Sequence, residues 1–119
     1  MRSFIISLSL LCSLPAFGEA STREFLQQYE AASDDGQLYL MSFVQGVVAG
    51  YRWTNLTLKS AKQKPMFCLS SHGASQLEDP VKVLKRAVKL EPTLLDSPVG
   101  MALLVNLKQR FPCREKPTK

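Results

Sequence analysis

Apolar residues recur along this chain at helical spacing nearly throughout, and no stretch shows the strict alternation of a half-buried strand. Proline, glycine and short polar runs interrupt the pattern and divide it into four apolar segments. The chain has no internal repeat and no low-complexity run. The pattern therefore predicts an all-α fold, a small domain built from four helices.

The first predicted helix is "STREFLQQYEAA", in which Ser21 or Thr22 can serve as the N-cap. Glu24 lies in its first turn, where a carboxylate meets free backbone N–H groups. The apolar side of this helix consists of Phe25, Leu26 and Tyr29. The following "SDDG" is rich in turn-forming residues and is predicted to end the helix.

The second predicted helix runs from about Gln37 to Thr54 and is apolar around most of its circumference, which predicts a central position. One broad stripe consists of Leu40, Phe43, Val44, Val47 and Tyr51. A second stripe consists of the small residues Ser42, Gly46, Ala49 and Gly50. Because glycine costs about 1 kcal/mol in a helix interior, we expect close packing inside the bundle to compensate for this stripe. The Gly46-x-x-x-Gly50 spacing resembles a membrane dimer motif, but Gln45 and Arg52 argue against a span.

The third predicted helix lies in "SQLEDPVKVLKRAVKL" and has two candidate starts. Ser75 and Glu78 have the spacing of a capping box, and Asp79 followed by Pro80 offers a second start. Its apolar face consists of Leu77, Val81, Leu84 and Val88, and its basic face of Lys82, Lys85, Arg86 and Lys89. This pattern is strongly amphipathic.

The fourth predicted helix follows "EPTLLDSP" and opens with Ser97 as its cap and Pro98 in its first turn. It continues through "VGMALLVNLKQR" to about Arg110 and is apolar on most sides. Pro112 ends it, and Cys113 follows at once.

The N-terminus has the order of a secretory signal peptide. Arg2 precedes an apolar run from Phe4 to Leu14, and the small residues Ala16 and Gly18 follow with one residue between them. We place the cleavage after Gly18, with Ala20 as the alternative. Residues 1–18 are therefore assigned to a cleaved signal peptide and 19–119 to a single exported domain.

Two other interpretations of this segment stay open. Cys12 could carry a lipid, although it follows a bulky leucine deep within the apolar run, and the run could instead be a buried N-terminal helix. The run is shorter than the ~20 residues of a spanning helix, so we expect no stable membrane anchor.

Removal of 18 of the 119 residues leaves 101, enough for one domain, with Cys68 and Cys113 as its cysteines. In an oxidising compartment, two cysteines in a small domain predict one disulfide. The bridge would tie the end of the fourth helix to the connection before the third. A reactive or intermolecular thiol is the alternative.

The groups that an enzyme needs are scarce in this sequence. His72 is the one histidine and lies in a polar stretch between Ser71 and Gly73. The acidic pairs Asp34-Asp35 and Glu78-Asp79 fall at predicted helix ends, where capping explains them. No Cys/His metal set and no glycine-rich phosphate loop is present. We therefore expect a protein that is not an enzyme and needs no metal or cofactor, and an enzyme using His72 is a minor alternative.

Charge is distributed unevenly along the mature chain. Residues 19–55 carry two basic and five acidic residues, whereas residues 56–119 carry twelve basic and five acidic ones. The basic face of the third helix is interpreted first as a solvated surface, with a membrane surface as an alternative. Nucleic acid is a further alternative, against which the absence of aromatic residues among these charges argues. A domain with this dipolar distribution suits a partner that carries a complementary patch.

Several short motifs together resemble the Rap/Tai family of immunity proteins associated with type VI secretion. They are "FVQGVVAGY", "FC", "SQL" before a helix, and "EPTLLDSPVGMALLVNLKQRFPC", and they cover Leu38 to Cys113. The closing "FPC", with a partner cysteine about 45 residues upstream, is the most specific part of the resemblance.

The resemblance implies an all-helical periplasmic antidote that binds a secreted peptidoglycan amidase, occludes its active site and catalyses nothing. It also implies that Cys68 and Cys113 form the family's disulfide, and that members are often dimers. A small periplasmic chaperone or envelope-stress helper of the same fold is the alternative function.

A loop that blocks an enzyme cleft must project from the domain. The long predicted connection Lys59–Gly73 is the first candidate, and Glu91–Asp96 is the second. The candidate partner-binding residues are Lys62, Lys64, Pro65, Met66, Ser71 and His72. The small-residue stripe of the second helix and the apolar fourth helix could belong to the core or form a homodimer seam.

Overall fold

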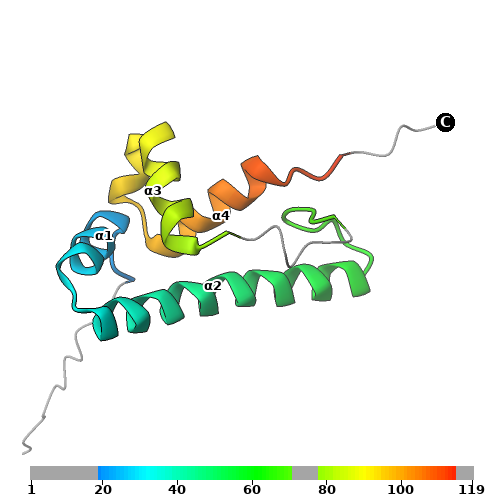
Figure 1. Cartoon of the computed structure of the whole chain (residues 1–119). Coiled ribbons are helices and arrows are strands. Elements are labelled where there is room, and N and C mark those ends of the chain that lie inside the picture. The colour runs from blue at the N-terminus through cyan, green and yellow to red at the C-terminus, as the bar shows by residue number, and fades with distance from the viewer. Residues whose placement is uncertain (1–18, 71–77, 115–119) are drawn as a thin grey trace, which may run out of the picture.

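The computed structural model describes residues 19–70 and 78–114. The elements are four α-helices, α1 (Thr22–Ala31), α2 (Asp34–Ser60), α3 (Pro80–Leu90) and α4 (Val99–Arg110), and a 3₁₀ helix, η1 (Pro92–Asp96). Figure 1 shows α2 as the longest element, with α1, α3 and α4 gathered on one side of it. The predicted all-α fold of four helices is confirmed, and so is the disulfide between Cys68 and Cys113. The predicted signal peptide lies outside the described residues.

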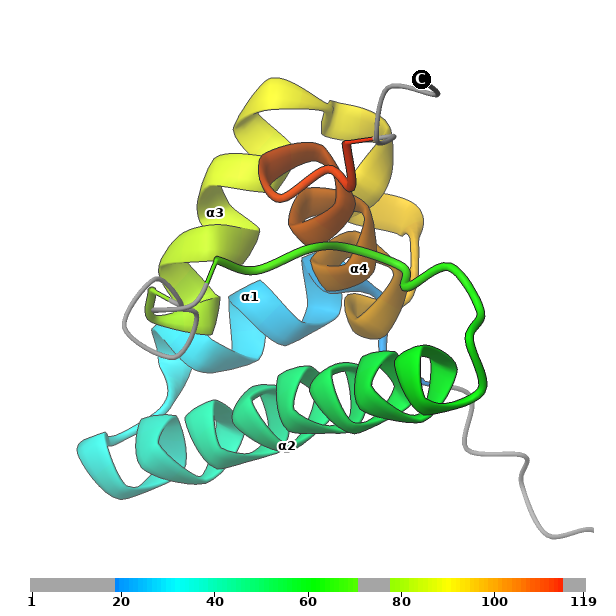
Figure 2. The ribbon, with the colours of Figure 1, turned by 90° about the vertical axis from the view of Figure 1, so that its right-hand side faces the viewer.

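The core lies where α3 packs against α4 and both meet α1 and α2 (Figure 2). Each helix contributes at least one fully buried apolar side chain, and these include Phe25, Val44, Leu84 and Leu103. Burying each of these side chains stabilises the fold by roughly 1.5–3 kcal/mol relative to leaving it in water. The core is therefore a single cluster shared by all four helices.

The amphipathic pattern predicted for α3 is confirmed where it is described. Val81 and Leu84 are buried, and the basic residues of the opposite face, Lys82, Lys85, Arg86 and Lys89, are exposed. Lys85 forms an ion pair with Glu30, and Arg86 forms one with Glu78. Two of the four basic groups thus have acidic partners within the domain, which agrees with a solvated face.

The start of α1 agrees with the prediction, whereas the start of α2 does not. Ser21 caps α1, and Glu24 accepts a hydrogen bond from the Ser21 backbone N–H at 3.0 Å, which completes a capping box. The "SDDG" run does not form a separate turn, because Ser33 accepts the N–H of Gly36 and α2 begins at Asp34. Serine and aspartate favour N-caps as much as turns, so the composition alone could not distinguish the two.

The small-residue stripe of α2 faces outward, which corrects the expectation that it packs inside the bundle. Ser42, Gly46, Ala49 and Gly50 are all exposed. A Cβ atom placed on Gly46 or Gly50 would meet no atom of a neighbouring element within 4 Å. The other helices cover the opposite side of α2, where Val44 is fully buried (Figure 1). Phe43 was expected in the inward stripe, but its side chain is 46% exposed.

Helix α3 begins at the second of its two candidate starts. Asp79 is the N-cap and accepts the N–H of Val81 at 2.8 Å, with Pro80 at the first helical position. Glu78 therefore lies before the helix and pairs with arginines, and Ser75 lies outside the described residues.

The predicted cap of α4 is wrong, because Ser97 lies too far upstream. Pro98 occupies the N-cap position and offers no side-chain acceptor. A carboxylate from the start of the domain replaces it: Glu19 accepts the N–H of Gly100 at 2.5 Å. Next to it, the Ala20 carbonyl accepts the N–H of Val99 at 3.3 Å. An anion at this position also interacts favourably with the helix dipole.

These contacts predict that a domain beginning at Glu19 is more stable than one beginning at Ser21. The shorter chain loses two acceptors for the first N–H groups of α4, and we expect its free energy of unfolding to be about 1–2 kcal/mol lower. Urea denaturation of the two purified chains would measure the difference. Equal stability would show that Glu19 and Ala20 contribute nothing to the cap.

Candidate partner-binding surface

The chain leaves α2 through a tight turn that contains a strained residue. The N–H of Gln63 donates to the carbonyl of Leu58 at 2.8 Å, and the N–H of Lys62 donates to that of Lys59 at 3.0 Å. This is the hydrogen-bond pattern of a Schellman motif, whose left-handed position is usually glycine. Here that position is held by Lys62, with φ of 56°. A lysine in this conformation costs roughly 1–2 kcal/mol relative to the right-handed region.

The segment after this turn is anchored to α2 by one buried side chain. Asn55 donates to the Phe67 carbonyl at 2.8 Å and accepts the N–H of Met66 at 2.8 Å. Asn55 is 8% exposed, so both hydrogen bonds are shielded from water. If the Asn55 amide were removed, the Met66 N–H and the Phe67 carbonyl would each be left without a hydrogen-bond partner.

The segment is fastened to the end of the chain as well. Cys68 is bonded to Cys113, and the backbone N–H of Cys68 donates to the Phe111 carbonyl at 2.8 Å. Phe67, which precedes Cys68 in the chain, is 1% exposed. The loop after α2 is thus held at three points, namely the Schellman turn, Asn55 and the disulfide.

We define the anchored loop as residues 61–68. Lys62 and Lys64 are exposed, and Lys59 is exposed in the last turn of α2. The prediction placed Lys59 at the start of the connection, but α2 continues to Ser60. The exposed part of the anchored loop is therefore basic and held in one shape before any partner binds. Rigidity of this kind raises affinity, because less conformational freedom is lost on binding.

Four of the six predicted site residues lie within the part of the chain that the structure describes. Lys62, Lys64, Pro65 and Met66 all lie in the anchored loop, and Pro65 and Met66 are half-buried. Ser71 and His72 lie outside the described residues. Sequence reasoning missed Asn55, although an asparagine within an apolar helix is a signal of a buried hydrogen-bonding role.

The second predicted loop does not project as an open segment. Residues Glu91–Asp96 form η1 and its cap, and Leu94 is buried in the core. Asp96 forms an ion pair with Arg23 of α1 at 3.0 Å. This connection therefore packs against α1, while Glu91, Pro92 and Thr93 stay exposed.

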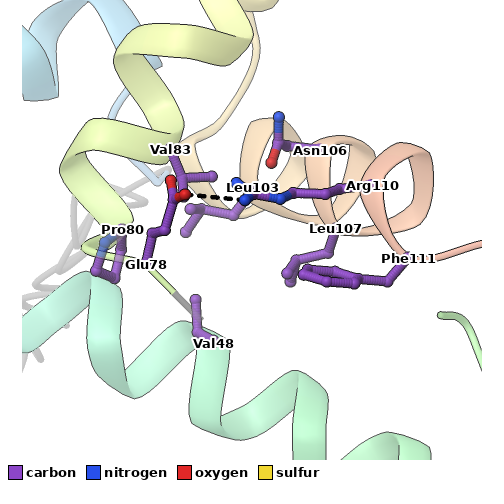
Figure 3. Close-up of a pocket in the computed structure, with 9 residues that line it drawn as sticks. All are labelled: Val48, Glu78, Pro80, Val83, Leu103, Asn106, Leu107, Arg110 and Phe111. Carbon is purple, nitrogen blue, oxygen red and sulfur yellow. Dashed lines mark hydrogen bonds and ion pairs between the residues drawn. The ribbon is translucent and has the colours of Figure 1, made fainter. Parts of the chain in front are cut away.

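Figure 3 shows a small pocket among α2, α3 and α4, with Glu78 paired to Arg110 along one side of it. Its volume is about 20 Å³, which is room for about one water molecule. Most of its lining is apolar, from Val48, Pro80, Val83, Leu103, Leu107 and Phe111. Asn106 also lines it, and its Oδ1 is buried without a hydrogen-bond partner among the described residues.

The Glu78 carboxylate beside this pocket makes the stability of the fold decrease at acid pH. Hydrogen bonds from Arg110 and then Arg86 lower the pKa of the Glu78 carboxyl to about 2. A carboxyl whose pKa is lower in the folded state stabilises the fold above its unfolded pKa, and this contribution is lost as the pH falls. We expect the melting temperature of the protein to fall between about pH 5 and pH 2, and the Glu78→Gln variant to show a smaller fall. Thermal melting of both proteins across this pH range would measure the fall. If the melting temperature fell equally in the parent and in the variant, Glu78 would not be the group responsible.

Among residues 19–70 and 78–114, no three His, Cys, Asp or Glu side chains are grouped so that they could hold a metal ion. No helix in the same ranges has the length and hydropathy needed to cross a membrane.

Comparison of the chain with protein-family models, with curated proteins and with solved structures finds no match.

Proposed function

We propose that this chain is a periplasmic immunity protein of the Rap/Tai type, which binds and inhibits a peptidoglycan amidase delivered by a type VI secretion system. The anchored loop, residues 61–68, enters or covers the cleft of the amidase. The proposal is supported by the signal-like N-terminus, by the motifs that resemble the family, and by the disulfide that joins the two cysteines of those motifs.

The observation that carries the proposal is the conformation of Lys62. A glycine would close α2 without strain, yet the chain presents a lysine with φ of 56° at the exposed turn. Strained residues held by well-anchored surroundings concentrate at functional sites. Lys62 is followed by a loop that Asn55 and the disulfide hold in place, so its charge is presented at a defined position. A rigid basic loop suits a partner surface that is acidic.

Contact competition tests the proposal directly. The gene is deleted in the bacterium that carries it, and the mutant is grown against its parent on a solid surface, where cells touch. We expect the mutant to lyse, the full chain to rescue it, and a chain beginning at Glu19 without the leader to fail. Equal competition against a parent whose secretion system fires would refute the immunity function, and a periplasmic helper would then be the better hypothesis.

Replacing Lys62 by glycine separates stability from function. Lys62→Gly relieves the left-handed strain, so we expect the free energy of unfolding to rise by about 0.5–1 kcal/mol. The same change removes a charge from the anchored loop, so we expect weaker protection of the deletion mutant in contact competition. Lys82→Gln is the matched control, because it removes one charge from the exposed face of α3. Full protection by Lys62→Gly at equal periplasmic level would exclude this side chain from the binding surface.

A further inference from the structure

A groove runs along one side of α2 and consists of two hollows that share residues. The first hollow, of about 190 Å³, is lined by Ala49, Arg52, Trp53 and Leu56. The second, of about 290 Å³, lies between α2 and the residues that begin α3, and Ala49 and Arg52 line it as well. Because the two hollows share these residues, they form one depression, which we call the α2 groove. It follows α2 over residues 45–56.

The α2 groove has the length of a short extended segment of chain. Gln45 and Leu56, at its two ends, are eleven residues apart in α2, and a helix of that length covers roughly 16 Å. An extended chain covers the same distance with about five residues. Ala49 lies where the two hollows meet, and its small side chain leaves the middle of the groove open. The shape therefore fits a single extended segment of another protein.

The two ends of the α2 groove differ in chemistry. Trp53 is 71% exposed and Leu56 is 54% exposed, so one end presents apolar surface to solvent. At the other end, Gln45 offers an amide, and the carboxylates of Glu78 and Asp79 line the opposite wall. An occupant therefore needs an apolar side chain at the first end and polar groups at the second.

Arg52 lies between these two ends and supplies a charge for binding. Its side chain is exposed, and no hydrogen bond or ion pair joins it to another residue in the described part of the chain. The carboxylates across the groove have other partners, because Glu78 pairs with Arg86 and Arg110, and Asp79 caps α3. A guanidinium can hold a carboxylate through two parallel hydrogen bonds. The charge of the groove thus fits a segment whose carboxylate reaches Arg52.

We propose that the α2 groove binds an extended segment of the amidase, with an apolar side chain of that segment against Trp53 and Leu56 and a carboxylate on Arg52. This inference rests on the proposed function and adds a second contact to that of the anchored loop. The anchored loop begins five residues after Leu56, which is roughly 8 Å along the helix. One partner surface of ordinary size can therefore cover both. Tryptophan and arginine are also the residues that most often carry the binding energy of an interface.

A lipid surface is a poorer occupant of the α2 groove. The carboxylates of Glu78 and Asp79 lie along its wall, and anionic headgroups would be repelled by them. Arg52 is a cation between the hollows, so a segment with one well-placed carboxylate complements the groove better than a uniformly charged surface does.

Contact competition with variants of the groove tests the proposal. Ala49→Leu fills the middle of the groove, and Arg52→Glu reverses its charge. Both residues are exposed, so the midpoint of urea denaturation should stay that of the parent. At equal periplasmic level, we expect each variant to leave roughly tenfold fewer survivors of the deletion mutant than the parent chain does. Thr54→Leu adds apolar bulk on another side of α2, and Lys82→Glu reverses a charge on α3, so both controls should protect fully.

Trp53 is the one tryptophan of the chain and reports on the groove directly. A domain labelled with 5-fluorotryptophan gives a single fluorine NMR signal. The amidase is identified as the product of the parent's gene whose loss stops lysis of the deletion mutant, and it is purified and added to the labelled domain. We expect the signal to shift. Arg52→Glu should raise the dissociation constant more than roughly tenfold, and Lys82→Glu should leave it unchanged.

The outcomes distinguish this inference from the immunity function. If the deletion mutant survives beside its parent, the immunity function fails and the inference fails with it. If the mutant lyses and Ala49→Leu and Arg52→Glu both rescue it fully, the groove is not a binding site and the immunity function stands. A complex in which the Trp53 signal does not move would overturn the inference too. A shift caused by phosphatidylglycerol vesicles alone, or by a higher concentration of the domain alone, would assign the groove to a lipid or to a second copy and overturn it as well.

Discussion

Removing the Cys68–Cys113 disulfide is expected to lower the free energy of unfolding by about 4 kcal/mol. The two cysteines are separated by 45 residues, and the bond restricts the unfolded chain between them. Small domains have roughly 5–15 kcal/mol of total stability, so the loss would leave this one near the threshold of folding. The double variant Cys68→Ala/Cys113→Ala, compared with the parent by urea denaturation and thermal melting, would measure the effect.

Treating the parent protein with a reductant is a second way to obtain the protein without the Cys68–Cys113 bond. It should match the double variant, and the reductant should leave the double variant itself unchanged. We also expect the double variant to protect poorly in contact competition, because the anchored loop loses one of its three attachments. A loss of stability below about 1 kcal/mol would mean that the bond contributes little beyond the contacts around it.

The second large effect is expected from Asn55→Ala. The variant leaves the Met66 N–H and the Phe67 carbonyl without partners beside a buried ring. Each unsatisfied backbone group costs roughly 1–3 kcal/mol, so we expect a loss of about 2–4 kcal/mol after partial relaxation. Urea denaturation measures the loss, and faster amide hydrogen exchange at Met66 would show that it originates in the loop.

Asn106 offers a matched control for this variant. It is also buried, at 6% exposure, but its Oδ1 has no hydrogen-bond partner among the described residues. Asn106→Ala therefore removes the same atoms without orphaning the anchored loop, and we expect a smaller loss and unchanged exchange at Met66. Equal effects of the two substitutions would indicate that volume, and not hydrogen bonding, explains the result.

Features that depend on neighbouring residues were predictable from the sequence. Helical periodicity predicted the helices, the Ser21 and Glu24 pair predicted the start of α1, and Asp79 with Pro80 predicted the start of α3 as one of two options. The disulfide followed from the number of cysteines and the export-like N-terminus. These predictions succeeded because capping and periodicity act within a few residues of the chain.

Features that depend on distant residues were not predictable in the same way. The acceptor at the start of α4 comes from Glu19, about 80 residues earlier, so no local motif could reveal it. The anchoring of the loop by Asn55 likewise depends on the chain folding back along α2. Lys62 gave no signal in sequence, because a left-handed backbone is expected at glycine or asparagine.

The sequence by itself determined that this protein is an all-α domain whose middle and end are joined by a disulfide. It also determined that α2 has two faces able to pack, one with large apolar residues and one with small residues. Only the tertiary structure decided which face is covered. Three short helices can shield one side of a 27-residue helix but not both, and the broad apolar stripe buries more surface than the small one. The small-residue face is consequently left exposed.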